Sequence, residues 1–412
     1  MKLSIDFVRS NFPQLQDEPE FVFCASAAGS YLAQPVIDNL EHYNRHWRVQ
    51  PYSPYPSSRA AGLAMDRARD GWSRALNIGA DELTIGPSTS INSYVMAQAL
   101  GADWGPGDEI VVTRQDHESN HGVWRRKAEA QGAVVKEWPI DPSTGLLDPA
   151  ELYPLLGERT RWVFFTHCSN IIGTVNPVAE IVSGIRQRSG AKACVDAVAY
   201  APHHIPDVKA LDVDMYLFSL YKVFGPHQGL MYLRAELQES IQAQSHFFIQ
   251  GDSHKRFNPA GPQHAQVAAC QGVLDYFAAL HRHHGGSESV SAAAMLQSVH
   301  ALTAAHEARL AAPLVDYLDH APRVRLLGKT HIRDGDRSTT IAFQPLGKSA
   351  ADVAKALQAR DIGVEHGHFY AHRLMTSLGI DPADGVVRIS LVHYNSVAEV
   401  DRILAALDQA LI

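Results

Sequence analysis

The sequence predicts an α/β fold, in which helices sandwich a mostly parallel, seven-stranded sheet and a smaller C-terminal α+β domain follows. Three observations carry this prediction. Short, almost continuously apolar runs alternate with amphipathic helical stretches from about residue 80 to residue 235, a pattern typical of parallel strands that are covered on both faces. A second alternation of strands and helices occupies the end of the chain. The length of 412 residues also exceeds what one core usually supports.

The expected strands of the larger domain are apolar runs separated by polar residues, glycines and helical stretches. They are Leu83–Gly86, Glu109–Thr113, Val134–Trp138, Arg161–Thr166, Lys192–Val198, Met215–Ser219 and Gly229–Leu233. Helical patterns separate several of them, at Ser90–Gly101, Ser119–Gln131 and Ala179–Arg188. Ligands of such sheets collect beyond the carboxyl ends of the strands, and the polar residues expected at that edge are Ser88, His117, Asn170, Asp196 and Lys222.

The C-terminal part of the chain has its own pattern. A long helical region runs from Gln263 to about Pro313, with an interruption near Gly285-Gly286. Strands and helices then alternate, at Arg323–Leu327, Thr339–Gln344, Ala350–Arg360 (helix), Ile362–Glu365, Val387–His393 and Ala398–Leu411 (helix). We therefore expect an N-terminal arm over residues 1–30 that contributes to the small domain and the site, a large domain over 31–275 and a small domain over 276–412.

The composition argues against several classes of function. The net charge of -8 and the pI near 6.2 disfavour binding to nucleic acid or to an anionic membrane. No apolar run reaches the roughly 18 residues of a membrane span. The four cysteines are far apart, and the 22 histidines form no HExxH motif or histidine–carboxylate cluster. We expect a cytoplasmic protein without a metal site, a membrane segment or a nucleic-acid partner.

A lysine segment and an aspartate point to a cofactor. Lys222 lies just past an apolar strand, with Ser219 before it and a Gly-Pro turn after it, and Asp196 closes another apolar strand. A lone aspartate here is usually a cap and a lone lysine is usually a surface residue. Together they match the needs of a pyridoxal phosphate (PLP) enzyme, in which a lysine amine bonds the cofactor and a carboxylate keeps its ring nitrogen protonated.

Motifs in the same order resemble the class V aminotransferase family of PLP fold type I, closest to its cysteine desulfurase and selenocysteine lyase branch. The quoted stretches are Gly86–Asn92 at the place of the phosphate loop, Asp116–Asn120 for Glu-His-x-Ala-Asn, Thr166–Thr174 for Thr-His-x-Ser-Asn-x-x-Gly-Thr, Asp196–His203 for Asp-x-x-Gln-x-x-Pro-His and Ser219–Lys222 for Ser-x-His-Lys. The resemblance spans nearly the whole chain and implies the fold and the cofactor.

The resemblance also implies roles for cofactor-binding residues. Ser88, Thr89 and Ser219 would contact the phosphate of PLP, because hydroxyls and N–H groups at a helix start bind a dianion. His117 would stack on the ring and assist proton transfer. Asn170 would hydrogen-bond the 3′-oxygen of the ring.

The chain departs from the family pattern at several cofactor positions. Ala199 replaces the glutamine of the aspartate motif, so one bond to the 3′-oxygen is expected to be missing. Tyr221 replaces a histidine, and a phenol also donates a hydrogen bond to phosphate. In relatives a Gly-Thr-Pro-Asn loop of a second subunit completes the phosphate site. Here the stretch reads Ala260–Gln263, so Gly261 would contribute backbone N–H groups in a homodimer.

The substrate side of the resemblance centres on Arg388, at the family's position for gripping the α-carboxylate with a planar guanidinium. The loop Glu365–Ala371 has Tyr370 where group II desulfurases have the nucleophilic cysteine, and Glu365 where they have an arginine. Tyrosine cannot accept sulfur, so a persulfide relay is not expected. The other residues expected to line a substrate pocket are Arg59, His366, His368 and His372.

These interpretations predict a PLP-dependent C–S lyase that acts on an amino acid by β-elimination, with Lys222, Asp196, His117 and Tyr370 as catalytic residues. Transamination and an epimerase or kynureninase-like reaction are the alternatives, because the carbanion left by removal of the Cα proton can react in more than one way. A PLP-binding scaffold that has lost its chemistry is a further alternative, against which the retained Lys222, Asp196 and Arg388 argue.

Overall fold

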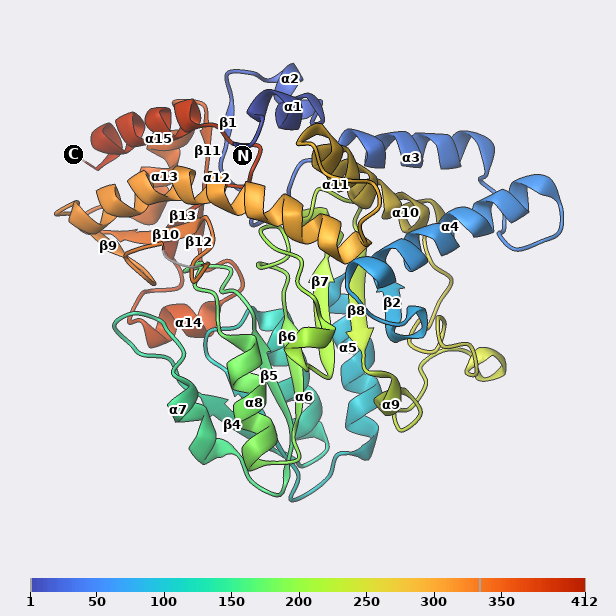
Figure 1. Ribbon diagram of the computed structural model, residues 1–412. Helices are drawn as coiled ribbons and strands as arrows, with labels where there is room; N and C mark the ends of the chain where they lie inside the picture. The colour runs from blue at the N-terminus through green and yellow to red at the C-terminus, as the bar shows by residue number, and fades with distance from the viewer. Residues whose placement is uncertain (1, 333–334, 412) are drawn as a thin grey trace.

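The larger part of the molecule is built on a seven-stranded sheet with the order β2-β8-β7-β6-β5-β3-β4 (Figure 1). This computed structural model describes residues 2–332 and 335–411. Among the strands of this sheet β8 alone runs against the others, pairing antiparallel with both β2 and β7. The strands are β2 (Leu83–Gly86), β3 (Glu109–Thr113), β4 (Val134–Trp138), β5 (Thr160–Thr166), β6 (Lys192–Asp196), β7 (Met215–Ser219) and β8 (Gly229–Leu233). The mostly parallel, seven-stranded sheet is confirmed.

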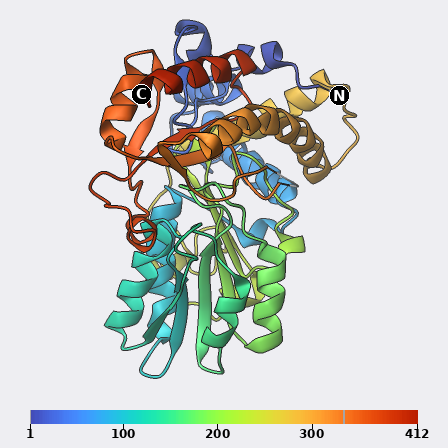
Figure 2. The ribbon, with the colours of Figure 1, turned by 90° about the vertical axis from the view of Figure 1, so that its left-hand side faces the viewer.

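Helices cover both faces of this sheet because alternate residues of its strands enter different cores. Val163 and Phe165 of β5 share a core with helix α8, whereas Trp162 and Phe164 share another with α5 and α6. Figure 2 shows the sheet between these layers. The covering helices are α5 (Thr89–Leu100), α6 (Gly122–Ala130) and α8 (Val178–Arg188). The near-continuous apolar strands seen in the sequence follow from this burial on both sides.

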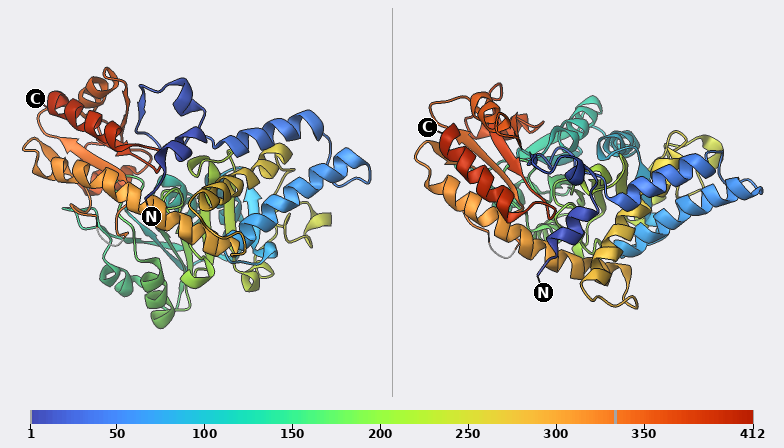
Figure 3. Two further views of the ribbon diagram at one scale, coloured as in Figure 1. Left: turned by 45° about the horizontal axis from the view of Figure 1, so that its top comes forward. Right: turned by 90° about the horizontal axis from the view of Figure 1, so that it is seen from above.

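The remaining helices of the larger part lie around the sheet and its edge. They are α1 (Ile5–Ser10), α2 (Gln14–Asp17), α3 (Gln34–His46), α4 (Pro56–Ala75), α7 (Pro149–Leu152), α9 (Ala235–Gln238), α10 (His264–Ala269) and α11 (Gln271–His283). Helices α10 and α11 pack against α3 and α4 (Figure 3). No helix in the described ranges is long and apolar enough to cross a membrane.

The smaller part is an antiparallel sheet with the order β12-β13-β10-β9 and a core of its own. Val22 and Phe23 form the short strand β1, which pairs in parallel with β11, so this segment of the N-terminal arm lies against the smaller part. The elements here are β9 (Val324–Leu326), β10 (Thr340–Pro345), α13 (Ala350–Gln358), β11 (Ile362–Gly363), β12 (Glu365–Gly367), β13 (Val386–Ser390) and α15 (Val397–Ala410). Helix α14 (His372–Ser377) lies between β12 and β13 in the chain but buries Leu374 and Met375 in the core of the larger part. An antiparallel C-terminal sheet with helices is the α+β unit that the sequence predicts.

The long helix α12 (Ala292–His320) joins the two cores (Figure 1). Its first half buries Val299 in the core of the larger part, and its second half buries Leu314 and Leu318 in the core of the smaller part. The predicted end near Pro313 is therefore wrong: tertiary packing of the residues beyond it keeps the helix going despite the proline. The predicted domain boundary at residues 275 and 276 falls inside α11, and the domain limits stay a prediction.

Two other element predictions need correction. The single strand expected over Ile362–Glu365 is split, because Ile362 and Gly363 pair with β1 while Glu365 begins β12 in a different sheet. The helix expected to begin at Ser119 begins at Gly122, after a 3-10 turn over Glu118–Asn120.

Candidate active site

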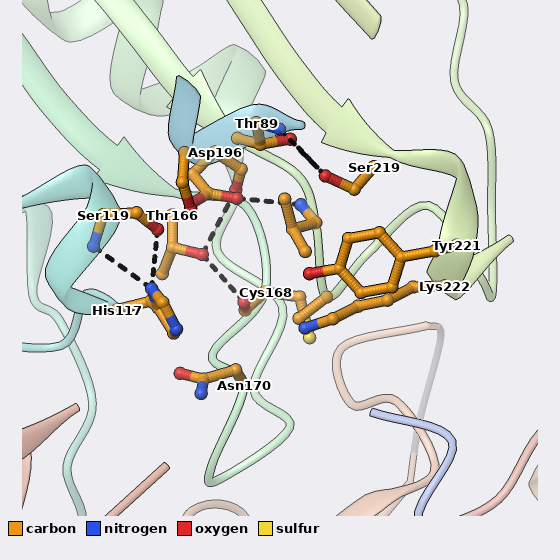
Figure 4. Close-up of a pocket in the computed structure, with 13 residues that line it drawn as sticks. Thr89, His117, Ser119, Thr166, Cys168, Asn170, Asp196, Ser219, Tyr221 and Lys222 are labelled. Carbon is orange, nitrogen blue, oxygen red and sulfur yellow. Dashed lines mark hydrogen bonds between the residues drawn. The ribbon is translucent and has the colours of Figure 1, made fainter. Parts of the chain in front are cut away.

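Side chains converge in one pocket beyond the carboxyl ends of the parallel strands (Figure 4). Strands β2, β3, β5, β6 and β7 all end at this edge, and the loop after each supplies part of the lining. The lining residues are Thr89, Ser90, His117, Ser119, Thr166, Cys168, Asn170, Asp196, Val198, Ala199, Ser219, Tyr221 and Lys222. Seven of the residues singled out from the sequence are thus brought together: Thr89, His117, Asn170, Asp196, Ser219, Tyr221 and Lys222.

Lys222 is held in the 3-10 turn that directly follows β7, and its amine points into the pocket (Figure 4). The side chain is buried, with a relative exposure of 7%. Burial, and then the positive charge of Arg388, lower the pKa of the amine to about 8. An amine with such a pKa is partly neutral near pH 7 and can act as a nucleophile or a base.

Asp196 ends β6 with its carboxylate in the pocket. The backbone N–H of Val198 donates to Oδ1 over 2.8 Å, and the N–H of His167 donates to the Asp196 carbonyl over 2.8 Å. Burial raises the pKa of the carboxyl to about 6. A buried carboxylate with a raised pKa is stabilised by a neighbouring cationic N–H group. A protonated ring nitrogen fits this position.

The start of helix α5 lines one end of the pocket. The N–H of Thr89 donates to Ser219 Oγ over 3.0 Å, and the two hydroxyl oxygens are 2.8 Å apart. A Cβ on Gly229 of β8 would lie 2.3 Å from the Ser88 carbonyl carbon, so only glycine lets the turn sit this close to the sheet. Hydroxyls and N–H groups at the start of a 12-residue helix fit an anion such as phosphate.

Ser88 and Tyr221 flank this end in different ways. Ser88 Oγ accepts the N–H of Ile91 over 3.2 Å and caps α5, so its side chain does not line the pocket. The Tyr221 hydroxyl points toward the pocket (Figure 4), and its ring stacks on His227 with the ring centroids 4.6 Å apart. Burial raises the pKa of the Tyr221 phenol, which therefore stays protonated and able to donate a hydrogen bond.

His117 faces Lys222 from the loop after β3 (Figure 4). Its Nδ1 accepts the backbone N–H of Ser119 over 3.1 Å and lies 2.6 Å from Ser119 Oγ. Burial, and then the charges of Lys222 and Arg388, lower the pKa of the imidazole to about 3. The ring is therefore neutral at pH 7, and with Nδ1 accepting, its proton is on Nε2.

Arg388 lies on β13 next to the pocket rather than in its lining. Its side chain is buried, and Nη1 donates to the Asn170 carbonyl over 3.0 Å. Nη2 lies 3.5 Å from Glu365 Oε2, and within the described part of the chain Nε has no hydrogen-bond partner. Burial lowers the pKa of the guanidinium to about 10. A desolvated guanidinium with donors to spare fits a carboxylate ligand.

The loop with Tyr370 packs over the mouth of the site. The amide Nδ2 of Asn170 donates to the Phe369 carbonyl over 2.9 Å, and the N–H of Glu118 donates to the Tyr370 carbonyl over 2.8 Å. The Tyr370 side chain is 69% exposed, and its ring centroid is 5.3 Å from that of His117. Tyr370 therefore lies beside His117 at the entrance, outside the pocket lining.

Three other predicted residues are not brought into this pocket. Arg59 is exposed on α4, where its guanidinium donates to the Pro54 carbonyl over 2.7 Å. Gly261 lies in an exposed loop. His368 is tied to its own loop, where its Nδ1 accepts the Tyr370 N–H over 3.1 Å. Of the further pocket candidates, His366 and His372 are exposed side chains.

Thr166, Cys168 and Val198 were not selected from the sequence as lining residues. Cys168 lies two residues from Asn170, Val198 lies two residues from Asp196, and Thr166 begins the motif that contains Asn170. The Cys168 Sγ is 3.5 Å from Ser338 Oγ. Burial raises the pKa of this thiol to about 12. Their position next to a motif residue, in the loop after a strand, was the signal that could have found them.

Within the described ranges no group of three or more His, Cys, Asp or Glu residues is placed to hold a metal ion.

Comparison with known proteins decides the family. The sequence profile described as Aminotransferase class-V matches residues 22–403. The chain belongs to the class V aminotransferase family. This class V aminotransferase is 36% identical over 416 residues to the aminotransferase-like protein FGM3 of Gibberella zeae, covering 99% of this chain and 98% of the relative. It is 31% identical to a cysteine desulfurase of Dickeya dadantii, covering 98% of this chain and 96% of the relative.

A solved structure confirms the fold. The crystal structure of the cysteine desulfurase CsdA from Escherichia coli superposes with a TM-score of 0.83 at 24% identity and covers 100% of this chain and 99% of that one. The sequence profile thus confirms the resemblance to the class V family, and the superposition confirms PLP fold type I. The class V aminotransferase described here is a PLP-dependent, cysteine desulfurase-like enzyme. Its pocket has an anion-binding end, a buried carboxylate and a buried lysine amine, and so fits PLP.

Proposed function

We propose that this class V aminotransferase is a C–S lyase, which removes a sulfur-containing group from Cβ of an amino acid by β-elimination. One observation carries the proposal. The loop that holds the sulfur-accepting cysteine in the desulfurase branch is present and packs over the site, but its side chain at that position is the phenol of Tyr370. The leaving sulfur then meets no thiol in this loop and departs into solvent.

The state of the cysteines supports this proposal. Cys24, Cys168, Cys194 and Cys270 are all free and buried. Burial raises the pKa of each thiol, to about 12 for Cys168, the one that lines the pocket. Persulfide chemistry requires a thiolate, which these environments disfavour. None of the four is suited to relay sulfur.

We propose the following roles around PLP. Thr89, Ser219 and Tyr221 bind its phosphate, with Gly261 supplied by a second subunit. Asn170 hydrogen-bonds its 3′-oxygen, and Asp196 binds its protonated ring nitrogen. When bound, PLP supplies an aldehyde for attachment of amines and an electron-withdrawing ring that stabilises negative charge on Cα.

The residues of the chain perform the remaining chemistry. Arg388 binds the α-carboxylate through two parallel hydrogen bonds and thereby fixes Cα next to Lys222. The Lys222 amine, whose lowered pKa leaves it partly neutral, accepts the Cα proton. The Cβ–S bond then breaks, and the electron pair leaves with sulfur. His117 through its Nε2–H and Tyr370 through its phenol are the proton donors for the departing group. The three-carbon fragment released becomes pyruvate and ammonia after it takes up water.

We also propose that two copies of the chain form a homodimer in the cytoplasm, each completing the other's site. Phe247 and Phe248 are 84% and 71% exposed, as expected of apolar side chains that a partner covers. Gly261 and Arg59 are exposed and lie outside the pocket of their own chain, which leaves them free to reach the pocket of the other. The four free cysteines suit a reducing compartment. Light scattering tests this pairing by measuring the molar mass in solution. The mass of a monomer at micromolar concentration would contradict the proposal.

A substrate panel tests the reaction type. The purified holoenzyme is offered L-cysteine, cysteine sulfinate and S-substituted cysteines without a keto acid. β-Elimination predicts pyruvate and ammonia from at least one of them. Transamination predicts no turnover until a keto acid is added, and epimerisation predicts the D-amino acid with no pyruvate. A holoenzyme that retains PLP but turns over none of these substrates, with or without a keto acid, would instead indicate a PLP-binding scaffold without chemistry.

A further inference from the structure

The flat face of the Arg388 guanidinium is covered by the ring of Phe369. The Cζ atom of Arg388 lies 3.7 Å from the centroid of this ring. A guanidinium stacked on an aromatic ring is held both by its charge and by its planar shape. Phe369 carries no group that takes part in proton transfer, and the sequence motifs gave no reason to select it.

The other contacts of Arg388 do not fix the orientation of the guanidinium plane. Nη1 donates to the Asn170 carbonyl over 3.0 Å. Glu365 Oε2 lies 3.5 Å from Nη2, on a side chain that is 49% exposed, so this ion pair is weak. Each of these contacts engages one end of the guanidinium. The stacked ring is the contact that limits rotation of the whole plane.

The backbone that presents Phe369 is strained. Phe369 and Tyr370 have φ angles of +45° and +60°, a left-handed conformation that side-chain-bearing residues rarely adopt. Hydrogen bonds from Asn170 Nδ2 to the Phe369 carbonyl and from the Glu118 N–H to the Tyr370 carbonyl hold it. Strained backbone that persists against a site is held there by the surrounding structure.

Asn170 connects the two sides of this arrangement. Its carbonyl accepts from Arg388, and its side-chain amide donates to the Phe369 carbonyl over 2.9 Å. Asn170 also lines the pocket that fits PLP. Arg388, Phe369 and Asn170 therefore form one connected set, in which the position of the loop fixes the direction of the guanidinium donors.

We propose that Phe369 is a positioning residue for recognition of the substrate α-carboxylate, acting through Arg388. This inference rests on the proposed role of Arg388 as the carboxylate-binding residue, but not on the type of reaction that follows. The stacked ring holds the guanidinium plane so that its free donors face a carboxylate. Loss of the ring lowers the affinity for α-amino acids specifically.

The test compares two ligands that differ by a carboxylate. L-Alanine is ethylamine with a carboxylate on the carbon that bears the amine, and neither ligand has a leaving group on Cβ. Each is titrated into the holoenzyme, and its dissociation constant is read from the change in the absorption of bound PLP. Phe369→Leu keeps apolar bulk but removes the aromatic face. We expect this variant to bind alanine about two- to thirtyfold more weakly, which is the range of a cation–π contact. Its dissociation constant for ethylamine should not change.

Further variants keep the test decisive. Phe369→Tyr restores an aromatic face and is expected to bind alanine as the parent protein does. Phe369→Met is a second apolar replacement if the leucine variant does not fold. The inference is overturned if both apolar variants bind alanine and ethylamine more weakly by the same factor. It is also overturned if the binding of neither ligand weakens. Arg388→Gln distinguishes failure of the proposed role of Arg388 from failure of the proposed role of Phe369. If this variant still binds alanine in preference to ethylamine, Arg388 is not the carboxylate-binding residue.

Discussion

The hydroxyl oxygens of Thr89 and Ser219 lie 2.8 Å apart, although 130 residues separate them in the chain. Thr89 begins α5, Ser219 ends β7, and both are buried. The contact exists because β8 places β2 and β7 on its two sides, so the loops after β2 and β7 meet at the same edge. A buried pair of hydroxyls with a helix start behind them is suited to a dianion.

Ser219→Ala is expected to weaken PLP binding by about tenfold or more, because a hydrogen bond to a charged group contributes roughly 1.5–3 kcal/mol. The dissociation constant is measured by titrating PLP into the apoprotein and following absorbance. Ser183→Ala, on the exposed side of α8, is the matched control and should change nothing. If the Ser219 and Ser183 variants bind PLP with the same affinity, Ser219 does not contact the phosphate.

Capture of PLP by the apoprotein is expected to accelerate as the pH rises, with a midpoint near pH 8. The neutral amine is the nucleophile, and burial with the charge of Arg388 lowers the pKa of Lys222 to about 8. The second-order rate constant is followed by stopped-flow absorbance across the pH range. A midpoint near the ordinary lysine pKa of about 10.4 would show that the amine is not desolvated.

Arg388→Gln provides an internal check on that profile. The positive charge of Arg388 disfavours the charged form of Lys222. Removing it should therefore raise the pKa of Lys222 and move the midpoint of the capture profile to higher pH. A midpoint that stays in place or moves down contradicts the electrostatic coupling of the two side chains.

Cys168→Ala is expected to keep most of its turnover with sulfur-containing substrates. Its thiol lines the pocket, but burial raises its pKa to about 12, so it is neither ionised nor nucleophilic at pH 7. The measurement is kcat for the variant and the parent, together with thermal unfolding to account for a small cavity. A loss of a hundredfold or more in a folded, PLP-loaded variant would mean that Cys168 takes part in the chemistry.

Stability is expected to fall as the pH drops below about 6.5, in part because His167 and His393 are buried in neutral form. Burial lowers the pKa of each to about 3, so the unfolded chain binds more protons between pH 6.5 and 3. Each contributes a slope of roughly 1.4 kcal/mol per pH unit in that window. Urea unfolding of the apoprotein at several pH values measures the slope, which His393→Gln should reduce. The exposed His246→Gln is the control, and identical slopes for the two variants would refute the assignment.

Much of the fold was readable because its strands are buried on both faces. The predicted bounds of β2, β3, β4, β7 and β8 agree with the structure residue for residue. The errors lie where tertiary contacts outweigh local signals. Buried Leu314 and Leu318 carry α12 past Pro313, and Ile362 leaves the strand of Glu365 to pair with the arm. No local pattern in the sequence encodes either contact.

The site was readable to the extent that its residues fall in motifs after strands. Thr89, Asn170 and Lys222 were found in this way and share one pocket. Phe369 was not selected from the sequence because no local pattern encodes its left-handed backbone or its contact with Arg388, which lies on another strand. The predicted contact of Gly261 belongs to a second copy of the chain and stays a prediction.

The most direct test of the account is the yield of pyruvate and ammonia from S-substituted cysteines with no keto acid present. The purified holoenzyme should release the two products in equal amounts over many turnovers. A variant with Cys24, Cys168, Cys194 and Cys270 all replaced by alanine should do the same if it folds and binds PLP. Turnover that depends strictly on an added keto acid, or sulfur that remains bonded to the protein, would contradict β-elimination without a persulfide cysteine.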